Sequence, residues 1–297
     1  MAVGDYFLLA LALALALANN AALRRFGNRG LNNMGDILAF NGCESLVWLA
    51  AALCAMRGLR PMAASTLFWG VAYGLALAGF FISKMQALIR GNVSLTTLVG
   101  CSSLIIPTLV GSFAFHEPIG AGQAVGLVLL LGSMAICVAP QRGAEAASAK
   151  WKVYVLLFFL FNGLVGLTFK FFSHTPGKDE IAQMLAVSST VSAVIFFLAA
   201  FLLNRRTGQP RPRVPGRALW YVLSCGGFSC AYTWINIHLA GALPSAVLFP
   251  VFNGGVIFGS TLLSRFLFKE RLSRLQWGGL LLGVLALMLA GRVIFGG

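Results

Sequence analysis

The segment FHEPIGAGQAVGL at residues 115–127 recurs as FKERLSRLQWGGL at residues 268–280. Phenylalanine, glutamate, glutamine, glycine and leucine agree between the copies at a constant offset of 153 residues, from Phe115 to Phe268. Each copy lies between two apolar runs, so it marks a connection between two elements of the same kind. The recurrence indicates that the chain consists of two related halves.

The apolar runs identify the class of protein. The chain has 297 residues, of which 59% are hydrophobic and only 10% are charged, and its mean hydropathy is +0.86. Soluble domains are roughly half apolar and about a quarter charged. Windows of about 19 apolar residues, long enough to cross a hydrocarbon core, fill most of this sequence. We therefore predict an all-α integral membrane protein with ten transmembrane helices at residues 6–23, 34–56, 63–88, 93–114, 119–139, 151–172, 180–203, 217–241, 243–267 and 274–295.

The ten spans divide into two sets of five. The first repeat is expected at residues 1–139 and the second at residues 151–297, with a linker at residues 140–150. Because five is an odd number, the second repeat enters the membrane from the opposite face, so the repeats are inverted. The connections are too short to hold a soluble domain, and any chemistry has to take place between the helices.

The two Phe-x-Glu pairs, each followed by a glutamine and a glycine (Gln123 and Gly126, Gln276 and Gly279), resemble the drug/metabolite transporter superfamily, in particular its ten-helix EamA-like members. The resemblance covers essentially the whole chain. It implies two five-helix repeats around a cavity lined mainly by the first, third, fourth, sixth, eighth and ninth helices. It also implies transport of a small solute, which in that superfamily ranges from metabolites, amino acids and nucleotide sugars to drugs.

One expected span carries residues that weaken a helix. The stretch FPVFNGG at residues 249–255 places Pro250, Asn253, Gly254 and Gly255 within the span 243–267. Proline removes a backbone donor and glycine loosens a helix, and an interrupted helix near the bilayer midplane points to a substrate site in inverted-repeat transporters. The alternative is a kink that serves only close packing. The equivalent region of the first half, residues 101–111, contributes Ser102, Ser103 and Pro107 as further candidates.

A single acid, Glu44, lies near the centre of a span, and Asn41 lies three residues before it. A carboxylate there costs about 2.5 to 3.5 kcal/mol on insertion scales, so it needs a partner or a proton. Glu44 is therefore a candidate for coupling transport to a proton gradient. Two alternatives stay open: the Glu44 carboxylate binds a cationic substrate, or it belongs to a purely structural pair.

Further candidates for substrate binding are polar residues on other spans. Asn162, Gly166 and Lys170 share one face at a spacing of four residues. Lys170 and Lys84 lie near span ends, where we expect their ammonium groups to reach the headgroups; an inward Lys170 would instead favour an anionic substrate, against the inference from Glu44. The amide group of an asparagine in a span can hydrogen-bond a substrate or a neighbouring helix, and both alternatives stay open here. The remaining candidates are Asn20, Asn236 and Trp234.

The net charge of +14 arises from Lys and Arg residues between the spans, so it reflects membrane topology and lipid headgroups as partners rather than nucleic acid. The six cysteines fall within spans and are expected to be apolar fillers. No motif for a nucleotide, a metal or a nucleophile is present, so we expect no cofactor and no enzyme activity. The spacings Gly122/Gly126 and Gly279/Gly283 allow helices to pack closely, either within the chain or in a homodimer.

These features favour a secondary transporter that moves a small organic solute by alternating access around a central polar cavity, driven by protons or by exchange. A lipid flippase or a passive channel would have the same kind of helices. A bacterial inner membrane is the expected location.

The charge distribution predicts the orientation of the spans. Of the 22 Lys and Arg residues, 17 lie on the side of the first connection and five on the other, which places that connection in the cytoplasm and both termini outside. Members of the resembling superfamily mostly have cytoplasmic termini. Fusions of a phosphatase or a fluorescent protein at residues 118 and 271 should report the outside and the cytoplasm, respectively. Reporters on the same side at both positions would contradict the inverted repeat.

Overall fold

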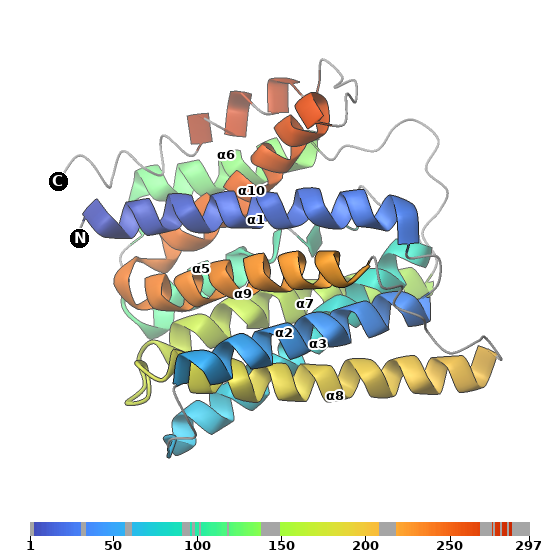
Figure 1. The fold of residues 1–297 in the computed structure, drawn as a ribbon. Coiled ribbons are helices and arrows are strands. Elements are labelled where there is room, and N and C mark those ends of the chain that lie inside the picture. Colours follow the sequence, from blue (N-terminus) through green and yellow to red (C-terminus); the bar gives the residue numbers. More distant parts are fainter. Residues whose placement is uncertain are drawn as a thin grey trace. The chain divides into compact units, whose positions relative to one another are not determined.

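The computed structural model describes residues 3–30, 34–56, 61–90, 96, 99–100, 102–117, 119–137, 149–207, 218–267, 275, 277–279, 281–283 and 285–286. These residues form helices joined by turns, and no strand occurs among them. The helices (Figure 1) are α1 (Val3–Gly30), α2 (Met34–Met56), α3 (Ala64–Arg90), α5 (Ile105–Ala114), α6 (Ala121–Cys137), α7 (Ala149–Phe172), α8 (Ile181–Thr207), α9 (Ala218–Ala242) and α10 (Ser245–Leu267).

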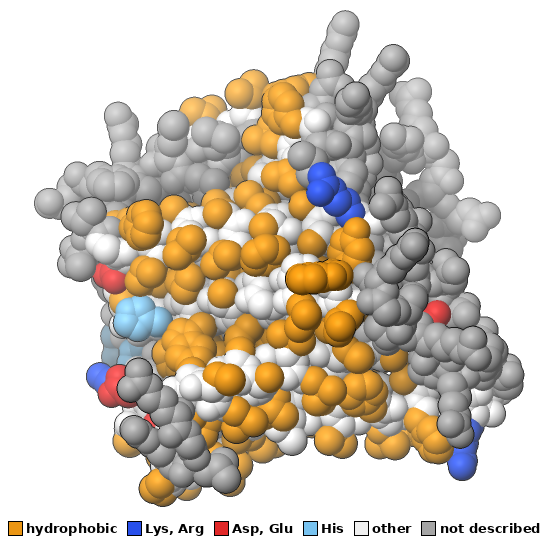
Figure 2. All heavy atoms as spheres, viewed as in Figure 1, with side chains coloured by type: hydrophobic (Ala, Val, Ile, Leu, Met, Phe, Trp, Pro, Cys, Tyr) orange, Lys and Arg blue, Asp and Glu red, His pale blue; other side chains and the backbone are white. Residues whose placement is uncertain are grey.

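The composition of the helices indicates a membrane location. Six of them, α1, α2, α3, α7, α8 and α10, are long and apolar enough to cross a bilayer, and α5 and α6 contain shorter apolar segments. Hydrophobic side chains are spread over the described part of the face shown in Figure 2. Large apolar side chains such as Phe7, Phe113 and Trp220 are 70%, 78% and 78% exposed. Apolar groups exposed in such numbers are typical of helices that contact lipid.

The helices agree with most of the expected spans. Nine expected spans coincide wholly or partly with a helix, although α5 fills only the second half of the expected span 93–114. α9 is long enough to cross a bilayer but is not among the six, since its serines, asparagine and histidine lower its hydropathy. The expected span 274–295 lies mostly outside the described residues. The count of ten spans therefore stays a prediction.

The chain divides into two compact units that alternate along the sequence. Unit 1 comprises Met1–Leu9, Gly79–Lys170 and Leu239–Gly297, and unit 2 comprises Ala10–Ala78 and Phe171–His238. Each unit therefore takes segments from both expected repeats. The expected linker 140–150 lies almost entirely outside the described residues.

In unit 2, α8 packs along α2 and along the first part of α3. A Cβ atom on Gly42 of α2 would lie 2.9 Å from the Phe197 ring, and one on Gly74 of α3 would lie 2.7 Å from the Ser188 carbonyl oxygen. Both helices thus approach α8 at glycines. The Ser192 hydroxyl of α8 also donates a hydrogen bond to the Ser45 hydroxyl of α2 at 3.0 Å.

In unit 1, α10 packs against α5 and α6. The Ser133 hydroxyl of α6 donates a hydrogen bond to the Gly279 carbonyl oxygen at 2.5 Å. Three contacts thus join segments that hold the same position in the two expected repeats. They are α2 with α8, α5 with α10, and Ser133 with Gly279.

The close approach of α3 to α8 can be tested at Gly74. A valine there would overlap Ser188 and Val191, and overpacking of this kind costs about 1 to 3 kcal/mol. Gly74→Val should therefore lower the melting temperature of the purified protein in detergent. The matched control is Gly227→Val on α9, where a Cβ would meet nothing within 4 Å. Equal melting temperatures for the two variants would show that α3 does not approach α8 in this way.

Candidate functional site

The face of α7 that carries Asn162, Gly166 and Lys170 lies against α5, α10 and the connections at their ends, all within unit 1. The spacing of four residues in the sequence predicted this common face. Asn162 and Lys170 bond backbone carbonyls of neighbouring segments, and Gly166 packs against side chains of α5 and α10.

Asn162 lies at a break in the expected span 93–114. Residues Ser103 and Leu104 form a turn rather than a helix, with short-range bonds from the Ser103 N–H to the Gly100 carbonyl oxygen at 3.2 Å and from the Ile106 N–H to the Ser103 carbonyl oxygen at 3.0 Å. The Asn162 amide nitrogen donates to the Gly100 carbonyl oxygen at 2.9 Å and to the Ser103 hydroxyl at 2.6 Å. A side chain of α7 therefore adds a second hydrogen bond to the Gly100 carbonyl oxygen at the break.

The expected interruption of the span 243–267 is not found. α10 is helical without a break from Ser245 to Leu267, with Pro250 inside it. The proline lies in the second turn, where it removes only one backbone hydrogen bond. Asn253 donates its amide to the Phe249 carbonyl oxygen at 2.9 Å, on the same helix. Gly254 is buried and Gly255 is half-buried. The break instead lies next to Pro107, which belongs to the first turn of α5, where its missing N–H has no helical partner to lose.

Gly166 allows α5, α7 and α10 to meet. A Cβ atom on Gly166 would lie 2.9 Å from Pro107 Cγ and 3.1 Å from Phe249 Cε1. Pro107 and Phe249 are both buried. This packed contact separates Asn162 from Lys170 along the face of α7.

Lys170 does not extend to the headgroups, so that expectation was wrong. Its side chain is buried and forms an ion pair with Glu117, whose side chain is 17% exposed. The Lys170 ammonium group also donates to the Ala240 and Leu243 carbonyl oxygens at 3.0 and 3.4 Å and lies 5.8 Å from the centre of the Phe115 ring. The second Glu117 oxygen accepts the Ser245 N–H at 2.8 Å. The pair therefore holds one carbonyl in the last turn of α9, one just after that helix, and the first amide of α10.

Glu117 was not among the candidates from the sequence. It lies in a turn after α5, where a carboxylate is commonly solvated, and nothing in the spacing links it to Lys170. The signal was its place in the repeated Phe-x-Glu pair, which we used only to define the repeat. His116, between Phe115 and Glu117, has a φ of 53°, a left-handed conformation that turns the chain after α5.

Unit 2 holds a second group of predicted residues on α2. Asn41 donates to the Ile37 carbonyl oxygen at 2.9 Å and Ser45 to the Asn41 carbonyl oxygen at 2.9 Å. The Trp48 indole donates to the Ser229 hydroxyl of α9 at 2.8 Å. The polar groups beside Glu44 on α2 are thus engaged elsewhere, and the described part of the chain gives the Glu44 carboxylate no hydrogen bond and no ion pair. Its electrostatic neighbours are the Cys225 and Tyr232 side chains of α9.

The other predicted residues of unit 2 differ in how far they are buried. Asn236 is buried, whereas Asn20 and Trp234 are half-buried. Asn19, beside Asn20, is buried, and among the described residues its side-chain oxygen has no hydrogen-bond partner. Ser102 is half-buried in unit 1. The structure thus brings together Asn162, Ser103 and Pro107 at the break in unit 1, with Lys170 farther along α7.

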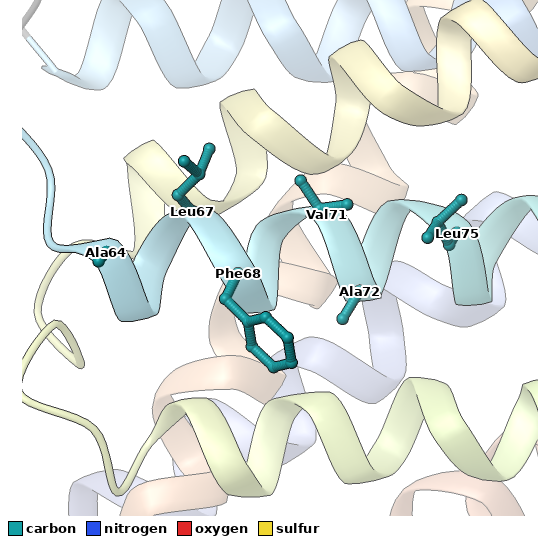
Figure 3. A pocket seen from close by; sticks show the side chains of 6 residues that line it. All are labelled: Ala64, Leu67, Phe68, Val71, Ala72 and Leu75. Carbon is teal, nitrogen blue, oxygen red and sulfur yellow. The ribbon is translucent and has the colours of Figure 1, made fainter.

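Two further features of the described residues bear on the site. A shallow groove follows one face of α3 (Figure 3) and is lined by Ala64, Leu67, Phe68, Val71, Ala72 and Leu75. Its lining is entirely apolar, as expected where a helix contacts acyl chains. Among the described residues, no group of three or more His, Cys, Asp or Glu side chains is placed to hold a metal ion.

Comparisons with known proteins show the fold but no activity. No family model matches the chain. An uncharacterized protein of Haemophilus influenzae (strain ATCC 51907 / DSM 11121 / KW20 / Rd) is 26% identical over 218 residues, which cover 73% of this chain and 72% of that protein. The crystal structure of another protein has a TM-score of 0.73 at 16% identity and covers 99% of this chain and 98% of its own. The fold described here has therefore been observed by experiment in another protein.

The two acids should respond differently to neutralisation. Glu117→Gln leaves the buried Lys170 without an anion, and breaking a buried pair costs about 3 kcal/mol or more. Glu44→Gln replaces a carboxyl group that has no partner in the described residues, so it should leave the melting temperature unchanged or raise it. Melting curves of the two variants in detergent measure the difference. A loss of stability in Glu44→Gln as large as that in Glu117→Gln would show that Glu44 has an essential partner.

Proposed function

We propose that the chain is a secondary transporter of the drug/metabolite transporter superfamily, and that it moves a small polar organic solute across a membrane by alternating access. In this proposal the ten helices form two inverted repeats, with both termini outside a bacterial inner membrane. No soluble domain and no cofactor takes part. The helices themselves bind the solute and change conformation.

The observation that carries the proposal is the broken helix at Ser103 and Leu104, with Asn162 bonded to it. In a bilayer, irregular backbone is tolerated only where protein or a water-filled cavity satisfies its polar groups. Transporters with inverted repeats use such breaks to bind substrate. The Asn162 amide nitrogen donates to Gly100 and Ser103, whereas the described residues give its Oδ1 atom no partner. That oxygen can accept a hydrogen bond from a hydroxyl or amino group of a solute.

The contacts between helices support the inverted repeat. The second span of the first half packs on the second span of the second half, as α2 on α8, and the fourth spans pack as α5 on α10. The Ser133 hydroxyl joins the fifth span of the first half to Gly279, in the fifth span of the second half. Contacts between corresponding spans are expected when two repeats surround a pseudo-two-fold axis. Gly279 and Gly283 are buried within the chain, so that glycine pair supports packing inside the chain.

The role of Glu44 in the proposal is to exchange a proton during transport. A carboxyl group without a cation or a hydrogen-bond donor is costly as an anion within a bilayer. Binding and release of a proton would change its charge as the site faces one side of the membrane and then the other. Glu44→Gln would in that case uncouple transport from a pH gradient while solute exchange continues.

The solute can be found by binding and then tested by transport. The purified protein is screened by thermal shift against a metabolite library, since a ligand that binds the folded state raises its melting temperature. For the solute identified, Asn162→Leu should weaken binding about tenfold, the equivalent of roughly 1.4 kcal/mol, and Asn253→Ala should act in the same direction. Thr261→Ala is the control, because Thr261 also bonds a carbonyl of its own helix, that of Ile257, at 2.8 Å. If Asn162→Leu binds the solute with unchanged affinity, the break at Ser103 and Leu104 is not part of the substrate site.

Proteoliposomes then distinguish a carrier from the alternatives. A carrier exchanges labelled for unlabelled solute in counterflow, whereas a passive channel does not. Movement of a headgroup-labelled lipid between leaflets, without solute counterflow, would instead identify a flippase and contradict the proposed transport of a soluble solute.

A further inference from the structure

The Glu117 carboxylate occupies a set of groups that would bind any carboxylate. One of its oxygens is paired with the Lys170 ammonium group, and the other accepts the Ser245 N–H at 2.8 Å. Ser245 is the first residue of α10, a helix of 23 residues. The first amides of a helix point outward and carry partial positive charge, so they favour a bound anion. A lysine and a helix N-terminus thus act on the same carboxylate.

These groups keep their places without Glu117. Lys170 is fixed by the Ala240 and Leu243 carbonyl oxygens at the end of α9, and the Ser245 N–H is fixed by the helix to which it belongs. Glu117, by contrast, belongs to a turn and is the more exposed member of the pair, at 17% against 3% for Lys170. The cation is therefore part of the helical framework, whereas the anion is carried on a connection.

A second observation points to a ligand at the same place. The Ser245 hydroxyl is completely buried, and no described residue forms a hydrogen bond with it. It lies beside the Glu117 carboxylate, because a Cβ atom on Gly111 would lie 2.8 Å from Glu117 Oε2 and nearer still to Ser245 Oγ. A buried hydroxyl without a partner is costly. Gly111 leaves room between the two groups that any other residue would fill.

We propose that Lys170 Nζ, the Ser245 N–H and Ser245 Oγ form a binding site for the carboxylate of an anionic solute, and that Glu117 occupies this site when no solute is bound. We call these three groups the carboxylate site. The inference rests on the proposed function and names a substrate class for it, that of solutes with a carboxylate group. A solute carboxylate displaces Glu117 with no change in the charge balance of Lys170, and the Ser245 hydroxyl supplies a donor that Glu117 leaves unused. Displacement also releases the turn after α5 from the start of α10.

The test removes the resident carboxylate and supplies a free one. Glu117→Ala in the full chain is titrated with sodium acetate, and its melting temperature is compared with that in sodium chloride at the same ionic strength. We expect a saturable rise in acetate and none in chloride, because acetate fills the vacated site. The wild-type protein, whose site is occupied, should need at least tenfold more acetate for the same rise.

Two double variants assign the effect to the carboxylate site. Glu117→Ala with Lys170→Met should lose the saturable response to acetate, whereas Glu117→Ala with Lys178→Met should keep it, since Lys178 is an exposed lysine in the connection after α7. If Glu117→Ala does not fold, Glu117→Ser takes its place, because it also removes the carboxylate and leaves room for acetate. A response to acetate no larger than that to chloride, or one that survives Lys170→Met, overturns the proposal.

The acetate titration involves no transport, so the two proposals fail separately. Saturable acetate binding without counterflow of any solute would leave the carboxylate site in place and refute the transporter. Counterflow of a solute without a carboxylate group, together with no response to acetate, would leave the transporter and refute the carboxylate site.

Discussion

Backbone amides and carbonyls inside a bilayer have no water to bond, and this constraint explains where the polar side chains of the chain lie. An unbroken helix satisfies its own backbone, but every break or helix end leaves groups that need partners. In unit 1 the partners are side chains. Asn162 bonds the Gly100 carbonyl oxygen at the break before α5, Lys170 bonds two carbonyls at the end of α9, and Glu117 accepts the first amide of α10. Asn162 and Lys170, which we first regarded as substrate ligands, thus have a structural task as well.

Polar residues have a different use in unit 2. Ser192 bonds Ser45 and Trp48 bonds Ser229, so these side chains connect α2 with α8 and α9. Hydrogen bonds between transmembrane helices contribute about 0.6 kcal/mol each on average, which is too little to explain a carboxyl group placed among them. Glu44 has no such partner in the described residues, and stability therefore does not account for it. This is the physical reason for the proposal that Glu44 exchanges a proton and that the ion pair of Lys170 has a separate role.

The helices could be predicted from the sequence because apolar length alone defines a span, and α2 begins and ends at the expected residues 34 and 56. The common face of Asn162, Gly166 and Lys170 also followed from helical spacing. We expected the break mainly in the second half, because Pro250 and two glycines outweighed Pro107 in the sequence, and the structure has it beside Pro107 instead. The position of the break depends on whether another helix supplies a donor to the backbone there. Asn162 supplies it to the Gly100 carbonyl oxygen, and the sequence does not show this because the two residues are far apart along the chain. Glu117 was missed for the same reason, since its partner is defined only by the tertiary fold.

The two charged groups of the proposed carboxylate site differ in how the chain holds them. Glu117 belongs to the repeated Phe-x-Glu pair and lies in a turn after α5, whereas the Lys170 ammonium group is held by the Ala240 and Leu243 carbonyl oxygens. A charge-assisted hydrogen bond is roughly twice as strong as a neutral one, so the ammonium group dominates the binding of any carboxylate at this place. In the proposed transporter, a solute carboxylate that replaces Glu117 therefore keeps the strongest bond of the site and changes only the segment that the site holds.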